Sequence, residues 1–417
     1  MKRYFLITGL FLTFMFSTGL HAQTKDLNYY INYSLENSPL LKDFQNQTIV
    51  NQIDSLILKT TYIKPSVDFS SSNFWAPIVD GFGYDESITH KGRNNALLTV
   101  RQSIVGQGNL KTKLNTYTLD NQLLQNEKKI SEQDLKLVIT TQYITTYGIL
   151  EEIHFNEELE NLLKKEEVLL KKLTESTVYK LTDYLNFQIK LQQHQLLVNQ
   201  QKAEYKNNLA ALNYLCGIID TSFVLLDKPE MILQTSLTFE NTLQYYQFQI
   251  DSLKIRNSDA LINYAYRPKL DIFADAGFNS TLSNYTYKHF GASIGFSLAI
   301  PIYDRGQRKQ EHDKLKIDEL TRKNYQDFSR QQYRQRIDQL YQQLSESERL
   351  IDQAQTIIKS TQTLMDAYAK QIQTGDASVT DYILSVNNYM SARHVITQHT
   401  INKIQIINQI NYWNHEK

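Results

Sequence analysis

The residue pattern from Leu270 to Asn279 alternates between apolar and polar positions, and a second run from Gly291 to Ile300 does the same. A period of two places successive side chains on opposite faces of a β-strand. The two runs, separated by a polar and aromatic turn, predict a hairpin over about 268–302. Each run has about ten residues, which is the length that a tilted strand needs to cross a bilayer.

A weaker version of this pattern predicts a second hairpin over about 65–105. Its first strand alternates at Val67 and Phe69, and its second strand carries Arg101 on the polar face. Arg101 is a candidate for lining a pore, with salt-bridged packing inside a barrel as the alternative. Alternation alone is equally compatible with a half-buried sheet in a soluble protein. Such a sheet needs an apolar layer to cover it, and the helices of this chain are apolar toward one another, which favours a membrane sheet.

Long helices account for most of the remaining sequence. The pattern predicts one helix over about Asp26–Tyr62 and two longer ones over Gly108–Leu173 and Gly306–Gln373, where proline is absent and glycine almost absent. At about 1.5 Å per residue, each long helix extends on the order of 100 Å. Apolar residues recur every seven positions, as in coiled coils: Leu123, Ile130, Leu137 and Ile144 in the first, and Ile337, Leu344, Ile351, Ile358 and Met365 in the second.

Turn signals follow the long helices. Gly375 and Asp376 mark a break, and Thr380 and Asp381 supply side chains that can cap the returning helix. The corresponding turn in the first half has Thr177 at the glycine position. We therefore expect the first turn to be built differently from the second.

The chain is an internal duplication. Residues match without a gap at an offset of 198 positions: Gly108 with Gly306, Thr182-Asp183-Tyr184 with Thr380-Asp381-Tyr382, and Asn213-Tyr214 with Asn411-Tyr412. A register kept over such a distance requires elements of constrained length, such as paired helices that turn at a fixed point. We divide the chain into a first repeat over 23–217, a linker over 218–240 and a second repeat over 241–417.

Residues 1–22 have the features of a secretory signal peptide. Lys2 and Arg3 precede an apolar run from Tyr4 to Leu20, and a possible cleavage site follows. An uncleaved anchor is the alternative, but the run is at the short end for a bilayer span of about 20 residues. Lysine and arginine balance aspartate and glutamate at 44 each, which gives no electrostatic reason to expect nucleic acid. The single cysteine, Cys216, excludes a disulfide framework.

Four strands of membrane length set a condition on assembly. An open sheet edge in lipid leaves unpaired backbone groups at several kcal/mol each, and four strands are too few to close a barrel. The chain must therefore oligomerise if its strands lie in a membrane. Two copies give eight strands, and three give twelve.

The sequence resembles the TolC family of outer-membrane efflux proteins over nearly all of its length after residue 22. The resemblance rests on four motifs: Asn37-Ser38-Pro39-Leu40, Arg267-Pro268-Lys269-Leu270, the strand-to-helix segment Ile300-Pro301-Ile302-Tyr303-Asp304-Arg305-Gly306, and the turn from Gly375 to Asp381. It implies a mainly α-helical chain with a membrane β-barrel portion. Three copies form a homotrimer with a twelve-stranded barrel in the cell outer membrane, and their long antiparallel helices form a coiled-coil helical barrel in the periplasm.

The function that the resemblance implies is a passive exit duct of a tripartite efflux or type I secretion system. Its implied partners are a periplasmic adaptor protein and, through it, an inner-membrane pump, together with outer-membrane lipid. The cargo, whether drug, metal or protein, is left open. The duct is gated at its periplasmic helical tips.

The resemblance also implies where individual residues act. It places Asp183 and Asp381 at the tips, and Asp381 where family members have an acidic ring facing the pore. From the residues alone, helix capping is an equally good role for each aspartate. Leu384 stands where some members have a second acidic residue, and Ala377 and Ile372 where an arginine and a tyrosine tie neighbouring tips together. We therefore expect closure to depend on apolar packing.

The candidate site residues fall into three groups. They are Asp381, Asp183, Gly375, Asp376 and Leu384 at the tips, Pro301, Gly306 and Gly108 at the strand-to-helix junctions, and Arg101 in the pore. Ser103 replaces the junction proline in the first repeat.

No pattern predicts catalysis, a cofactor or a resident metal, because the nine histidines are scattered and no His-Glu-x-x-His motif occurs. Two non-enzyme alternatives to the channel remain. A soluble periplasmic coiled-coil scaffold or adaptor is opposed by the amphipathic strands, and a monomeric surface adhesin is opposed by the short predicted outer loops.

Overall fold

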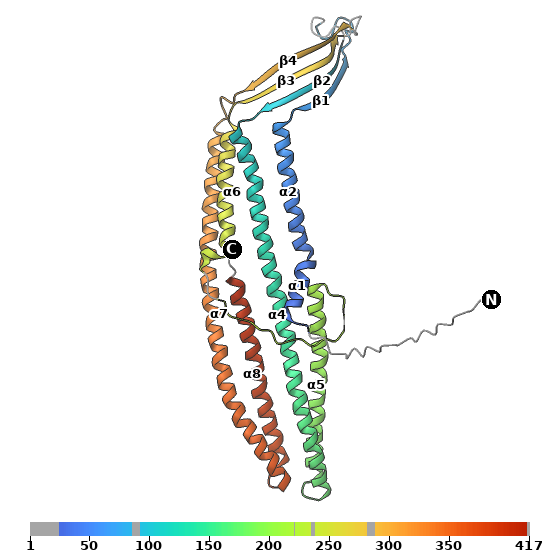
Figure 1. Cartoon of the computed structure of the whole chain (residues 1–417), viewed down its shortest axis with the longest axis vertical. Helices are drawn as coiled ribbons and strands as arrows, with labels where there is room; N and C mark the ends of the chain where they lie inside the picture. The colour runs from blue at the N-terminus through green and yellow to red at the C-terminus, as the bar shows by residue number, and fades with distance from the viewer. Residues whose placement is uncertain (1–24, 86–91, 221, 235–237, 282–287, 415–417) are drawn as a thin grey trace, which may run out of the picture. The chain divides into compact units, whose positions relative to one another are not determined.

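The computed structural model describes residues 25–85, 92–220, 222–234, 238–281 and 288–414. The predicted signal peptide lies outside these residues. In each half of the chain, a helical segment is followed by two strands and then by two helices (Figure 1). Their bounds are α1 Leu27–Asn37, α2 Pro39–Ile63, β1 Ser66–Trp75, β2 Gly92–Ile104, α4 Gln107–Glu175, α5 Leu181–Cys216, the 3-10 helix η1 Phe239–Asn241, α6 Leu243–Ala265, β3 Lys269–Thr281, β4 Phe290–Ala299, α7 Gln307–Thr374 and α8 Val379–Trp413.

The chain forms two units, and each unit contains segments from both halves of the sequence. Unit 1 consists of residues 1–37, 138–231 and 346–405, and unit 2 of residues 38–137, 232–345 and 406–417. Unit 2 therefore contains the sheet with α2 and α6, and unit 1 contains the two helical turns. Within the described ranges, no helix combines the length and apolar character needed to cross a membrane.

The four strands form one antiparallel sheet in the order β1-β2-β3-β4. The predicted hairpins are the β1–β2 and β3–β4 pairs, and β2 joins β3 with Arg101 opposite Phe273. Gly277 of β3 permits this pairing, because a Cβ there would lie 2.1 Å from the carbonyl oxygen of Ala96 in β2. β1 and β4 form the two open edges of the sheet.

The predicted helix over Asp26–Tyr62 is two helices, so this part of the prediction was wrong. Ser38 is extended (φ −60°, ψ 118°) and separates α1 from α2. Pro39 disfavours the helical conformation at the residue before it, and the Ser38 hydroxyl accepts a hydrogen bond from the Leu41 N–H (3.4 Å), which caps α2. Asn37-Ser38-Pro39 therefore ends one helix and starts the next.

Polar side chains hold the helices of unit 2 together. The Asn257 amide in α6 donates to the carbonyl oxygen of Thr112 (3.2 Å) and to the hydroxyl of Thr116 (2.8 Å) in α4. The buried Asn126 of α4 donates to the Leu243 carbonyl oxygen (3.2 Å). Since buried polar groups are costly unless they are hydrogen-bonded, these asparagines determine how α4 and α6 align.

The core of unit 1 is apolar and lies behind the two turns. It joins α4, α5, α7 and α8, so that both helical hairpins share it. Its fully buried side chains include Leu163, Leu170, Phe187, Tyr382 and Val386. The rings of Phe187 in α5 and Tyr382 in α8 stack with centroids 6.1 Å apart.

Candidate functional site

One face of the sheet is polar and carries Arg101. Directly paired residues point to the same face, so Arg101 and Phe273 share it, and the Arg101 guanidinium lies 5.9 Å from the centre of the Phe273 ring. Ser103 donates to Asp271 (2.5 Å), and Ser293 donates to Asp275 (2.8 Å), on this same face. Charged and hydrogen-bonding groups therefore extend across β2, β3 and β4 on one side.

The opposite face is apolar and exposed. Its middle is formed by Ile294 of β4, which is 82% exposed, opposite Ala274 of β3. The exposed large apolar residues of this face are Val67, Phe69, Trp75, Leu98, Val100, Ile104, Ile272, Phe278, Phe290, Ile294, Phe296 and Leu298. Soluble monomers seldom expose contiguous apolar surface of this extent, which marks a face that contacts lipid or another protein.

The two strand-to-helix junctions differ around Pro301. β4 ends at Ala299, before Pro301, which has no N–H to donate to a strand ladder. Ser103, at the same position of the first repeat, lies within β2, and β2 continues to Ile104. The junction proline therefore ends its strand earlier than serine does.

Asp304 caps the helix that begins after Pro301. Its carboxylate accepts hydrogen bonds from the N–H groups of Gly306 (3.0 Å) and Arg308 (3.1 Å), and these bonds lower the pKa of the Asp304 carboxyl. Gly306 has φ 78°, a left-handed conformation that glycine adopts without steric cost. Asp304 was not among the predicted site residues, although an aspartate before a helix is a recognisable capping signal.

Gly108 matches Gly306 in sequence but has a different structural role. It is the second residue of α4, and a Cβ there would lie 2.4 Å from the Tyr264 hydroxyl oxygen of α6. The glycine of the first repeat therefore allows close helix approach, whereas that of the second repeat allows a left-handed turn.

The two tip turns have the same backbone structure, so the expectation that they differ was wrong. Thr177 has φ 62° and Gly375 has φ 79°, both left-handed. The N–H of Val178 donates to the Leu173 carbonyl oxygen (2.9 Å), and the N–H of Asp376 donates to that of Gln371 (3.0 Å), at matching repeat positions. Hydrogen bonding of the helix end determines the turn, and Thr177 adopts a conformation that its side chain disfavours.

We predict that Thr177→Gly raises the free energy of unfolding by about 1 kcal/mol. A left-handed conformation costs a residue with a Cβ roughly 1–2 kcal/mol, and the greater freedom of glycine in the unfolded chain offsets part of this gain. Denaturant unfolding of the purified protein measures the change. Ser176→Gly is the control, because Ser176 lacks a positive φ and loses a hydrogen bond to the Lys172 carbonyl oxygen (3.0 Å). Destabilisation by both variants would contradict the prediction.

The two tip aspartates have different surroundings. Asp183 accepts a hydrogen bond from the Lys180 N–H (3.3 Å) at the start of α5, so it caps its helix. In the second turn the cap is Ser378, whose hydroxyl accepts from the Thr380 N–H (3.1 Å). Asp381 is exposed in the first turn of α8, and no described residue hydrogen-bonds its carboxylate. Asp381 is thus the aspartate that is available for a role outside its own helix.

Gly375, Asp376 and Leu384 complete the predicted tip site. The Asp376 carboxylate accepts from the Thr374 hydroxyl (2.6 Å) within the turn. A Cβ at Gly375 would lie 2.8 Å from the Val178 side chain, so the two turns are in contact there. Leu384 is 57% exposed, one turn after Asp381.

A tyrosine that sequence reasoning missed links the two turns. The Tyr179 hydroxyl lies 2.8 Å from the Ala377 carbonyl oxygen and 3.2 Å from that of Ile372, and donates its single proton to this pair. Burial and the carboxylates of Asp376 and Asp183 raise the pKa of the Tyr179 hydroxyl, which keeps the proton in place. This hydrogen bond lies within one chain, so the expectation that closure between neighbouring tips depends more on apolar packing stays a prediction. The side chains of Ala377 and Ile372 are buried, but their backbone carbonyl oxygens accept the hydrogen bond from Tyr179.

Glu166 lies in the core behind the turns. One of its carboxylate oxygens is buried, and no described residue hydrogen-bonds it. The same holds for the Tyr382 hydroxyl. Burial raises the pKa of the Glu166 carboxyl, and the Glu166 charge adds to the burial that raises the pKa of Tyr382. An ionised Glu166 is therefore unfavourable in the folded tip.

We predict that Glu166→Gln stabilises the protein at pH 7 by about 1 kcal/mol, because a buried charge without a partner costs more than the neutral amide that replaces it. Below the usual carboxyl pKa of 4.5, Glu166 is protonated in both the folded and the unfolded chain and carries no penalty. As pH rises from there through the raised pKa, only the unfolded chain gains from ionisation, so stability is lost. Unfolding measured at pH 4 and pH 7 tests this, with the exposed Glu158→Gln as control. An equal effect at both pH values would contradict it.

No group of three histidine, cysteine, aspartate or glutamate side chains in the described ranges is placed to hold a metal ion. Cys216 is buried and unpaired. The predicted site residues thus form three separate groups, at the tips, at the junctions and on the polar face of the sheet.

Comparison with known proteins identifies the fold. No protein-family model and no curated protein matches the sequence. The outer-membrane channel OprN matches with a TM-score of 0.74 at 12% identity, over 94% of this chain and 90% of OprN. The outer-membrane protein VceC of Vibrio cholerae matches with a TM-score of 0.73 at 11% identity, over 94% of this chain and 96% of VceC. The CmeC outer-membrane channel of Campylobacter jejuni matches with a TM-score of 0.71 at 14% identity, over 93% of this chain and 85% of CmeC.

Likeness at this level of identity establishes the fold. It confirms the predicted combination of long helices and four antiparallel strands, which the resemblance in sequence motifs implied. The chain therefore has the fold of the TolC-family outer-membrane channels.

Proposed function

We propose that this protein is the outer-membrane channel of a tripartite efflux or type I secretion system, a homotrimer that acts as a passive exit duct. The observation that carries the proposal is the sheet of unit 2. One face is apolar and exposed over all four strands, and the other is polar. Both faces have a suitable environment if lipid covers the apolar face and water covers the polar face, as in the wall of a membrane pore.

The open edges of the sheet support assembly from several copies. In lipid, the unpaired backbone groups of β1 and β4 need partners, and the β4 edge of a neighbouring copy supplies them to β1. Exposed apolar residues also follow the helices next to these edges: Ile49, Ile53, Leu56 and Ile57 on α2, and Ile317, Leu320, Tyr325 and Phe328 on α7. If β1 pairs with β4 of the next copy, α2 lies beside α7 of that copy, and the exposed apolar residues of both helices are covered.

This contact is head-to-tail, so it must close into a ring. Three copies give the twelve strands that the resemblance to the TolC family implies. We propose that Arg101 lines the pore on the polar face, and that the chain is a duplication of 23–217 and 241–417. The helical part of the trimer extends into the periplasm in this proposal.

The tips act as the gate in this proposal. Asp381 and Leu384 are exposed at the start of α8, and the Gly375–Asp376 turn contacts the first turn through Val178. Three copies of Asp381 around a narrow opening form an acidic ring that favours cations. A periplasmic adaptor joins the tips to an inner-membrane pump, which supplies the energy.

The experiment that tests the proposal is extraction followed by conductance measurement. The protein should sediment with outer membranes, require detergent, have the mass of a trimer by light scattering and conduct ions in planar bilayers. Recovery of a water-soluble monomer without conductance would overturn the proposal. A photo-crosslinking residue at the exposed Lys180 should capture the adaptor, and a failure of capture in cells that contain a working trimer would overturn the assigned docking position.

A further inference from the structure

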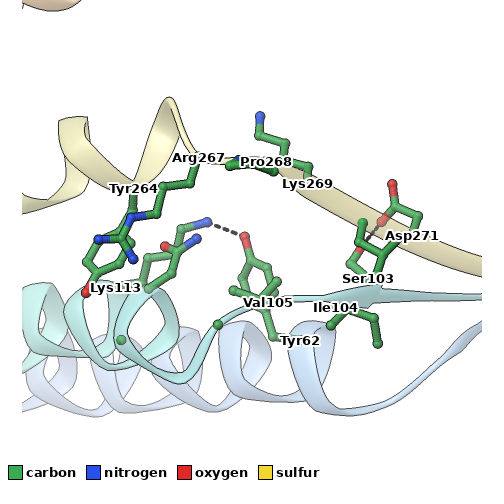
Figure 2. Close-up of a pocket in the computed structure, with 14 residues that line it drawn as sticks. Tyr62, Ser103, Ile104, Val105, Lys113, Tyr264, Arg267, Pro268, Lys269 and Asp271 are labelled. Carbon is green, nitrogen blue, oxygen red and sulfur yellow. Dashed lines mark hydrogen bonds between the residues drawn. The ribbon is translucent and has the colours of Figure 1, made fainter. Parts of the chain in front are cut away.

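A cavity of about 450 Å³ lies in unit 2 between the β2–α4 junction and the α6–β3 junction (Figure 2). Its walls come from the end of α2, the start of α4, the end of α6 and the first residues of β3. Its volume is typical of small-molecule sites. Ser103 and Asp271 of the polar face also line it, but neither the tip residues nor Arg101 belong to it.

Two cations are held in the walls of the cavity by aromatic rings. The Lys113 ammonium lies 4.5 Å from the centre of the Tyr62 ring and donates a hydrogen bond to the Tyr62 hydroxyl. The Arg267 guanidinium lies 4.5 Å from the centre of the Tyr264 ring. Lys269 adds a third cation at the rim, with its side chain directed away from the other two (Figure 2).

The lining of the cavity has three cationic side chains and one carboxylate. No described carboxylate forms an ion pair with Lys113, Arg267 or Lys269. Asp271 supplies the single carboxylate of the lining and accepts a hydrogen bond from the Ser103 hydroxyl (2.5 Å), which leaves its charge in place, so the lining keeps a positive balance. Lys113 and Arg267 retain N–H donors that can bind an anion.

The cavity also meets the apolar face of the sheet. Ile104 and Leu270 line the cavity and are paired residues on that face. A ligand that fits both features has an anionic head group and apolar chains. We propose that the cavity binds the phosphate head group of an anionic phospholipid, with its acyl chains against the apolar face. The lipid source rests on the proposed function, because it requires the strands to lie in a membrane; a soluble phosphate ester shares the head-group chemistry.

Native mass spectrometry of the detergent-purified protein tests the site, with phosphatidylglycerol, phosphatidylcholine and glycerol phosphate as probes. Loss of one charge-assisted hydrogen bond weakens binding about tenfold, so Lys113→Gln with Arg267→Gln should weaken phosphatidylglycerol binding about 100-fold. Lys111→Gln with Lys309→Gln is the matched control, because both residues are exposed, lie in the first turns of α4 and α7, and do not line the cavity. This control should bind phosphatidylglycerol as the wild type does.

The possible results distinguish a lipid from a soluble phosphate ester, and they test the lipid site separately from the proposed channel. If glycerol phosphate binds as tightly as phosphatidylglycerol, with the same dependence on Lys113 and Arg267, the acyl chains contribute nothing, and this result assigns the site to soluble phosphate esters and overturns the lipid source. Equal weakening in the control variant, or equal binding of the zwitterionic phosphatidylcholine, overturns the site. Conductance of the Lys113→Gln, Arg267→Gln variant should match that of the wild type, so failure of the lipid site leaves the channel proposal standing.

Discussion

Ile294→Arg is expected to abolish most of the trimer assembled in the outer membrane. Ile294 is in the middle of β4, on the apolar face, and is 82% exposed. If this face contacts lipid, arginine near the bilayer midplane costs about 2–4 kcal/mol per chain, and a trimer carries three copies of the change. Quantification of trimer in outer-membrane fractions by electrophoresis without heating measures the loss.

Ser293→Arg provides the matched control. Ser293 is the neighbouring residue on the polar face, where its hydroxyl bonds Asp275, so an arginine there faces water and an acidic partner. We expect this variant to assemble normally. In a soluble scaffold, arginine at the exposed Ile294 would be harmless, because surface substitutions away from special features change stability by only about 0.5 kcal/mol. Equal assembly of both variants would therefore contradict the membrane channel.

Tyr179→Phe is expected to open the channel. The change removes the hydrogen bond to the Ala377 carbonyl oxygen and keeps the ring in the core. One hydrogen bond is worth about 1 kcal/mol, and three chains that open together lose about 3 kcal/mol, which shifts the closed-to-open equilibrium by about 100-fold. Single-channel recording in planar bilayers should show a higher open fraction at unchanged trimer stability.

Tyr184→Phe separates this link from a general loosening of the tip. The Tyr184 hydroxyl donates to Glu167 (2.5 Å), and both residues belong to the α4–α5 hairpin, so the bond does not connect the two turns. We expect this variant to conduct as the wild type does. An equal increase in open fraction for both variants would show that Tyr179 has no special role in holding the turns together.

Tyr179 also explains how the two repeats cooperate at the tip. Its repeat mate is Ala377, 198 residues later, and the hydroxyl of the first contacts the backbone of the second. In the proposed gate, this polar contact joins the turn of the first repeat to that of the second.

Local pattern predicted the secondary structure where one physical requirement dominates. Alternation in β3 and β4 follows from having a different environment on each face, and the absence of proline allows α4 and α7 to continue for 69 and 68 residues. The helix break at Ser38 could also have been predicted from the sequence, since Pro39 follows it, but the apolar pattern on both sides favoured one continuous helix. Tertiary structure did not need to decide these elements.

Other features depend on partners that are distant in sequence. The sequence by itself determined the strands, the long helices and their order, because these follow from periodicity and backbone preference over neighbouring residues. The division into two repeats stays a prediction. Only the tertiary structure decided that Gly108 is small because Tyr264 approaches it, and that Tyr179 meets Ala377. Packing brings such groups within bonding distance, and that distance cannot be predicted from their spacing along the chain.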